Sequence, residues 1–301
     1  MRASFAVALL AGCGSSSGPA PSAGSGSSGS GAAVVAAAPV PPPPAFPTFV
    51  LATPSAAADS AVMLACAASP KYPSDTAATC ADLVGHQPPL SVISLAPADK
   101  PLALGARKAV PCTTGPSQPG FAISSSTVAD RFLISPPSRR ADLVLANRAP
   151  TVTPAVIAAM TSQAAAVFEY LPTPSGKFHT ISDAIIRSSV DADIDGDGQP
   201  DTIYSVEVPT PRANEMYLSI LFGAMSRQSG ALAPLFVSKD SHALAVAALD
   251  VDKDGSAELL VTSTGYHMTG AYLVKYGPGA PDGVDGTAGL MTPFGAWFCG
   301  D

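Results

Sequence analysis

Two nine-residue segments of this chain share one acidic frame, and each lies between apolar runs. Asp193–Asp201 and Asp250–Glu258 both carry an acid at positions 1, 3, 5 and 9 and a glycine at position 6. In a tight loop these alternate positions direct carboxylates toward one point, while the glycine lets the backbone reverse. Two carboxylates about 4 Å apart repel by about 4 kcal/mol at an effective dielectric of about 20. Each segment is therefore predicted to need a cation.

The ligand types predict which cation binds. Carboxylates and a backbone carbonyl are hard oxygen donors, and their number suits the six to eight ligands of calcium better than the strict octahedron of magnesium. We expect two Ca²⁺ sites, one formed by Asp193, Asp195, Asp197, Gln199 and Asp201 and one by Asp250, Asp252, Asp254, Ser256 and Glu258. The residues at position 7, Gln199 and Ser256, would contribute their backbone carbonyls. We expect both ions to be structural, because every position is already filled by a protein ligand.

The segments that follow the loops are apolar and strand-like. An EF-hand would place a bidentate glutamate at position 12, where this chain has Tyr204 and Val261. The loops are therefore predicted to lie between strands. Aligning the two exit strands puts Asp201 opposite Glu258, which leaves Asp191 outside the ligand set.

The loop motif resembles the FG-GAP and VCBS repeat families of bacterial surface proteins, the former also found in the propeller of integrin α-subunits. The likeness spans residues 181–277 and includes a later strand that ends in glycine in each unit, at Gly223 and Gly277. It implies propeller-like, calcium-binding β-repeat units. Two departures are that neither Phe222-Gly223-Ala224 nor Phe294-Gly295-Ala296 precedes an acidic loop, and that only two units are visible. An irregular β-barrel or sandwich is the alternative.

Short apolar runs separated by turn residues predict a mainly β fold, in keeping with 26 Gly and 31 Pro. Before residue 150 these runs are Ala61–Ala67, Leu90–Leu95, Leu102–Ala106, Phe121–Ser124, Phe132–Ser135 and Leu143–Ala146. After residue 180 they are Ile181–Val190, Thr202–Val208, Met216–Phe222, Leu235–Ser238, Ala243–Leu249, Leu259–Ser263 and Ala271–Lys275. One helix is expected, from Pro154 to about Tyr170, after a Thr-Pro start signal. We predict a β region over 48–150, a helix and connection over 151–180, and the repeat region over 181–301.

The N-terminal segment has the features of an export signal. Leu10-Ala11-Gly12-Cys13 follows a short apolar run and resembles the lipobox of bacterial lipoproteins. The resemblance implies that residues 1–12 are a signal peptide and that Cys13 is lipidated. An ordinary secretory signal with a chance cysteine is the alternative. Residues 13–47, rich in Gly, Ser and Pro, are predicted to be a disordered tether. No apolar run is long enough to span a bilayer, so a cell-envelope location would depend on the lipid alone.

The remaining cysteines form an even set, as expected in an oxidising compartment. Three pairings of Cys66, Cys80, Cys112 and Cys299 are possible. We favour Cys66 with Cys80, which would close a short loop, and Cys112 with Cys299, which would hold the C-terminus. Free buried thiols are the alternative.

No catalytic motif is visible in the sequence, and no basic stripe indicates a nucleic-acid partner. The histidines His86, His179, His242 and His267 stand singly, Trp297 is a weak candidate for ligand contact, and Arg139-Arg140 is interpreted as a solvated loop. The leading hypothesis is a lipid-anchored, calcium-stabilised envelope protein that binds an envelope protein or polysaccharide or serves a structural role. The rival is a calcium-dependent envelope hydrolase or lyase acting on polysaccharide or phosphoester. A cluster of His, Arg and acid residues beside one metal loop would favour the rival.

Overall fold

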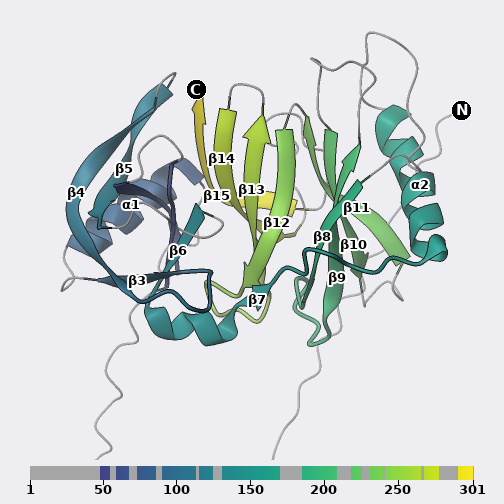
Figure 1. Cartoon of the computed structure of the whole chain (residues 1–301), viewed down its shortest axis with the longest axis horizontal. Helices are drawn as coiled ribbons and strands as arrows, with labels where there is room; N and C mark the ends of the chain where they lie inside the picture. Colours follow the sequence, from purple (N-terminus) through teal and green to yellow (C-terminus); the bar gives the residue numbers. More distant parts are fainter. Residues whose placement is uncertain are drawn as a thin grey trace, which may run out of the picture. The chain divides into compact units, whose positions relative to one another are not determined.

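The computed structural model describes residues 48–54, 59–67, 73–85, 90–112, 115–124, 131–169, 185–208, 218–225, 231–239, 241–265, 268–277 and 291–300. These residues form a closed barrel, two further antiparallel sheets and two α-helices (Figure 1). The mainly β class is confirmed, together with the barrel alternative. The predicted signal peptide, Cys13 and the tether lie outside the described residues, as do His86, His179 and His267.

The first half of the described chain closes into a six-stranded barrel in the order β1-β2-β5-β4-β3-β6. Its strands are β1 (Phe49–Ala52), β2 (Ser60–Cys66), β3 (Ser91–Ser94), β4 (Leu102–Cys112), β5 (Gly115–Ile123) and β6 (Phe132–Ser135). Pairing of β1 with both β2 and β6 closes the ring. Every residue of β1, β2 and β6 is buried, which explains why these strands are apolar apart from one terminal serine each in β2 and β6. A 3-10 helix, η2 (Pro137–Asp142), follows β6.

A second α-helix, α1 (Pro73–Gly85), corrects the prediction of one helix. Ala77, Cys80, Ala81 and Val84 recur at helical spacing and are buried, and the last three pack into the barrel core. Alanine and cysteine are weak hydrophobic signals, so this periodicity is hard to see in the sequence. The Cys66–Cys80 disulfide joins α1 to β2, which is the pairing predicted.

Two antiparallel meanders follow the barrel. The first is a four-stranded sheet of β8 (Ile185–Ala192), β9 (Asp201–Val208), β10 (Leu218–Met225) and β11 (Ala231–Lys239). The second comprises β12 (Ser241–Leu249), β13 (Glu258–Gly265), β14 (Met268–Tyr276) and β15 (Met291–Gly300), with β7 (Val144–Leu145) paired to β12 at its edge. In both meanders an acidic loop joins the first strand to the second, so the two repeat units predicted from the sequence have the same strand order.

The five-stranded sheet lies between the barrel and the four-stranded sheet (Figure 1). One of its faces shares a core with the barrel, including Val246, Leu260 and Leu273. The other face shares a core with the four-stranded sheet, where Phe236 and Tyr272 meet edge to face at 5.7 Å. Both faces are thus buried, as the continuous apolar run of β12 predicted.

Buried serines connect the four-stranded sheet to the part of β12 that precedes its pairing with β7. The Ser188 hydroxyl donates to the Ala245 carbonyl at 2.9 Å, and the Ala245 amide donates to Ser205 Oγ at 3.0 Å. Ser219 donates in the same way to the Ser241 carbonyl at 2.8 Å. These hydroxyls satisfy backbone groups that a strand edge would otherwise leave unpaired in the core.

The predicted helix is α2 (Pro154–Glu169), which confirms the Thr-Pro start signal. Val156 and Met160 pack on the outer face of the four-stranded sheet (Figure 1). The second predicted disulfide, Cys112–Cys299, joins β4 of the barrel to β15. None of the helices in the described part of the chain is long and apolar enough to cross a membrane.

Candidate metal centre

The two acidic loops lie against one another. The first joins β8 to β9 and the second joins β12 to β13, and the Ala257 amide of the second donates to the Asp193 carbonyl of the first at 2.7 Å. Gly196 is also close to the second loop, because a Cβ placed there would lie 2.6 Å from Ser256 Oγ. The predicted ligands from segments far apart in sequence are therefore gathered at one end of the facing sheets.

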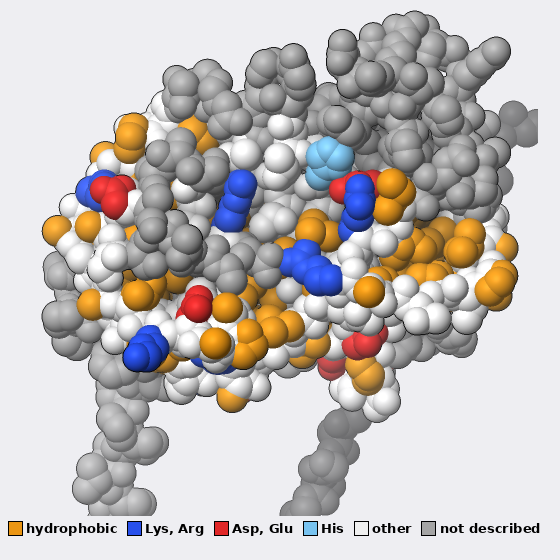
Figure 2. Space-filling view, in the orientation of Figure 1, with side chains coloured by type: hydrophobic (Ala, Val, Ile, Leu, Met, Phe, Trp, Pro, Cys, Tyr) orange, Lys and Arg blue, Asp and Glu red, His pale blue; other side chains and the backbone are white. Residues whose placement is uncertain are grey.

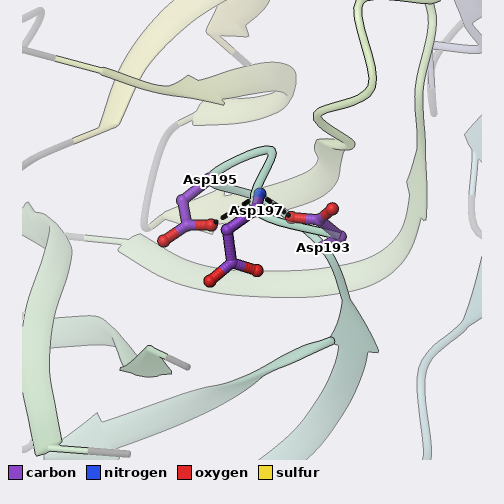
Figure 3. Close-up of side chains that lie close together, drawn as sticks. All are labelled: Asp193, Asp195 and Asp197. Carbon is purple, nitrogen blue, oxygen red and sulfur yellow. Dashed lines mark hydrogen bonds between the residues drawn. The ribbon is translucent and has the colours of Figure 1, made fainter. Parts of the chain in front are cut away.

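Backbone amides organise the first loop around Asp193. Asp193 Oδ1 accepts from the amides of Gly196 at 2.8 Å and Asp197 at 3.1 Å, and Oδ2 accepts from Gly198 at 2.7 Å. The Asp197 amide lies between two carboxylates, because it also points to Asp195 Oδ1 at 3.2 Å (Figure 3). The three carboxylates at positions 1, 3 and 5 bring ligand atoms within 4.8 Å of one another.

The second loop repeats this arrangement. Asp250 accepts from the amides of Asp254 at 3.2 Å and Gly255 at 3.0 Å. Asp250, Asp252 and Asp254 likewise bring ligand atoms within 4.8 Å of one another. At position 7 the Gln199 amide donates to Asp197 at 2.8 Å and the Ser256 amide donates to Asp254 at 2.9 Å. The shared frame of the sequence is therefore a shared backbone structure.

The acid at position 9 of each loop accepts a hydrogen bond from the backbone amide at position 2. The Ile194 amide donates to Asp201 at 3.1 Å, and the Val251 amide donates to Glu258 at 2.7 Å. Both acids have an exposed fraction of 0%, and so do the apolar residues at position 2, Ile194 and Val251. Each loop is thus fixed to the core by a buried apolar side chain and a buried carboxylate beside it.

A lysine from β14 enters the second loop. Lys275 Nζ lies 2.6 Å from Asp252 Oδ2, 2.6 Å from Asp254 Oδ2 and 3.0 Å from Glu258 Oε1. The contact with Glu258 is an ion pair without hydrogen-bond geometry, so Oε1 accepts no hydrogen bond from any described residue. Lys275 was not among the residues predicted for the site. The pairing of Leu259 with Val274 places it beside Glu258, and only strand register carries this signal.

The electrostatics of the second loop follow from burial and from this lysine. Burial, with a smaller contribution from Asp252, raises the pKa of Glu258 to about 7, although the Val251 amide and Lys275 oppose the shift. Burial alone would lower the pKa of Lys275, but its carboxylate partners raise it above its usual value. Burial also disfavours ionised Asp254, yet the hydrogen bonds from Lys275 and Ser256 leave the pKa of Asp254 lowered. Lys275 therefore opposes the effect of burial on the pKa of both Asp254 and Glu258.

The second loop is also held by an arginine that the sequence analysis placed in a solvated loop. Arg139, in η2, donates to the Asp250 carbonyl and to Asp142 Oδ2, the latter at 2.6 Å, and its side chain is only 12% exposed. Its neighbour Arg140 donates to the carbonyls of Ser94 at 2.9 Å and Pro97 at 3.0 Å. The interpretation as a solvated loop is therefore wrong. Asp191, expected outside the ligand set, accepts from Thr202 Oγ1 at 2.7 Å.

A histidine, an acid and an arginine meet at the other end of these strands. His242 Nδ1 lies 2.9 Å from Glu207 Oε1, and Arg187 Nε donates to Glu207 Oε2 at 2.7 Å. On the face shown in Figure 2 a histidine lies next to acidic and basic side chains. Glu207 is six residues beyond Asp201 along β9, which corresponds to about 20 Å of extended strand. The cluster is thus remote from the acidic loops.

Comparison with models of known protein families, with curated proteins and with the solved structures finds no match.

Proposed function

We propose that this chain is a lipid-anchored, calcium-stabilised β-repeat protein of the cell envelope with a binding or structural role. The observation that carries the calcium assignment is the convergence of Asp193, Asp195 and Asp197 on one point. Calcium–oxygen distances are about 2.3–2.6 Å, so ligand oxygens on opposite sides of the ion lie about 4.6–5.2 Å apart. The ligand atoms of these three residues lie within 4.8 Å of one another, close enough for one ion to contact all three.

The donor chemistry of the first loop supports the same ion. Amide hydrogen bonds hold Asp193 in place, and each of its carboxylate oxygens keeps lone-pair capacity for a cation. Asp201 adds a carboxylate at the base of the loop, and the carbonyl at position 7 completes an all-oxygen set. A bound cation would neutralise these charges and stabilise the junction of the two sheets.

The binding or structural role is favoured over hydrolase or lyase activity by the position of the polar clusters. The rival hypothesis called for a His–Arg–acid cluster beside a metal loop. His242, Arg187 and Glu207 do form such a cluster, but it lies at the opposite ends of the strands. A ligand of this protein would be an envelope protein or a polysaccharide.

The calcium proposal is tested by thermal unfolding of the full chain in millimolar calcium and again in chelator. A ligand at 100 times its dissociation constant stabilises by about 2.7 kcal/mol, which raises the midpoint by several degrees. Asp195→Ala should abolish this rise. Asp191→Ala is the matched control, because Asp191 is an acid two residues before the loop and should leave the rise intact. A midpoint of thermal unfolding that is the same in calcium and in chelator would overturn the proposal.

The lipid anchor is tested separately, by producing the chain with its own N-terminus in a bacterial host. The protein should partition into the detergent phase on Triton X-114 extraction, and Cys13→Ser should move it into the aqueous phase, because a lipid attached to sulfur is then lost. Equal partitioning of the two proteins would contradict the anchor without affecting the calcium assignment.

A further inference from the structure

The second acidic loop already contains a cation supplied by the protein. The Lys275 ammonium is within 3.0 Å of carboxylate oxygens from Asp252, Asp254 and Glu258, which occupy positions 3, 5 and 9 of the frame. An ammonium group has three donors and no acceptor, so it can face three carboxylates at once. The residues expected to ligate a metal are thus the residues that hold the lysine.

The amine is placed there by strand register. Leu259 pairs with Val274, so the preceding residue of β13, Glu258, lies beside the following residue of β14, Lys275. The lysine side chain is 22% exposed and Glu258 has an exposed fraction of 0%. The ammonium therefore reaches the loop from the neighbouring strand β14, next to the buried acid at position 9.

The first loop has a different residue at the corresponding register position. Thr202 pairs with Ala224, so the acid at position 9, Asp201, lies beside Met225. Met225 has an exposed fraction of 0% and packs in the same core as Ile194. A thioether brings no charge, so this position does not supply the first loop with a cation.

We propose that Lys275 is the resident cation of the second loop, so that the first loop is the calcium site and the second is closed to calcium by its own lysine. This inference rests on the proposed calcium site of the first loop. A divalent ion could occupy the second loop only after the ammonium left it, because the two positive charges would share the same carboxylates. Neutralising one loop internally also limits the charge gathered where the two loops touch at Asp193 and Ala257.

The test counts calcium ions bound per chain by equilibrium dialysis at millimolar free calcium. The native chain should bind one ion. Lys275→Met, which copies the residue of the first loop, should bind two, and Met225→Lys should bind none. Two ions on the native chain, or no gain in Lys275→Met, would overturn the lysine assignment. If the native chain binds none and Lys275→Met binds one, the lysine assignment stands and the calcium site of the first loop fails.

A labelling experiment on the native chain keeps the inference testable if Lys275→Met does not fold. Acetylation of the calcium-free protein should modify Lys275 at least about tenfold more slowly than Lys253, the exposed lysine at position 4 of the same loop. The reason is that the Lys275 amine lies among three carboxylates on a side chain that is only 22% exposed, whereas Lys253 is exposed. Equal rates at the two lysines would overturn the assignment.

Discussion

The first and second acidic loops adopt the same backbone and differ in the residue that the neighbouring strand places beside the acid at position 9. Position 4 shows how closely the backbones agree, because Gly196 and Lys253 both have a left-handed φ, 74° and 61°. In both loops the carboxylate at position 1 accepts amides of positions 5 and 6, and the acid at position 9 accepts the amide of position 2. The opposing strand, in contrast, offers methionine to one loop and lysine to the other.

The backbone structure of these loops and their charge balance therefore depend on different residues. The backbone of each loop is held by amides that donate to its carboxylates and by an apolar residue in the core. The charge balance is set by one residue on a neighbouring strand, outside the motif. Two loops with identical frames can therefore differ in whether they take a metal.

The largest expected difference in stability between the two loops comes from replacing the acid at position 9. In chelator, Glu258→Ala should destabilise the protein by about 2–4 kcal/mol, because it leaves the Val251 amide without its acceptor and removes a partner of Lys275. Asp201→Ala should cost less, since it also removes one of several converging carboxylates. Urea unfolding of both variants in chelator measures the difference.

In millimolar calcium, Asp201→Ala should instead be more destabilising than Glu258→Ala. Asp201→Ala then loses the calcium stabilisation of the first loop, about 2.7 kcal/mol at 100 times the dissociation constant, in addition to its own cost. Glu258→Ala should keep that stabilisation, because its loop is neutralised by Lys275. If calcium changes both variants by the same amount, the two loops are equivalent and the contrast between them is wrong.

How far the sequence predicted this molecule depends on whether a feature is local. The acidic frames, most strands and α2 were predicted from short segments, because their signals lie within a few residues. The two disulfides were instead favoured among three possible pairings of the cysteines. Closure of the barrel and helix α1 were not predicted. Nothing in the sequence of β1 specifies β6 as its second neighbour, and the buried face of α1 is built on Ala77, Cys80 and Ala81.

The same limit applies to the candidate site. Its predicted ligands at positions 1, 3 and 5 are brought together, but the residues that make the two loops unequal come from outside the motif. Lys275 reaches the second loop through the pairing of β13 with β14, and Arg139 reaches it from η2 after the barrel. Lys275 and Met225 lie on the strands that pair with the two exit strands. Extending the alignment of the exit strands to these partner strands would have pointed to both residues.

The smallest expected effect concerns the contact between the loops. Gly196→Ala should destabilise the protein by about 1–2 kcal/mol, because its left-handed backbone strains an L-residue and its Cβ would lie 2.6 Å from Ser256 Oγ. Gly198→Ala is the matched control, since Gly198 has φ 83° and a Cβ there would meet nothing within 4 Å. The difference between the two variants in chemical denaturation isolates the contact of the first loop with the second. Equal losses would mean that the Ser256 side chain moves away from the added methyl group without a measurable loss of stability, so that this contact between the loops contributes little.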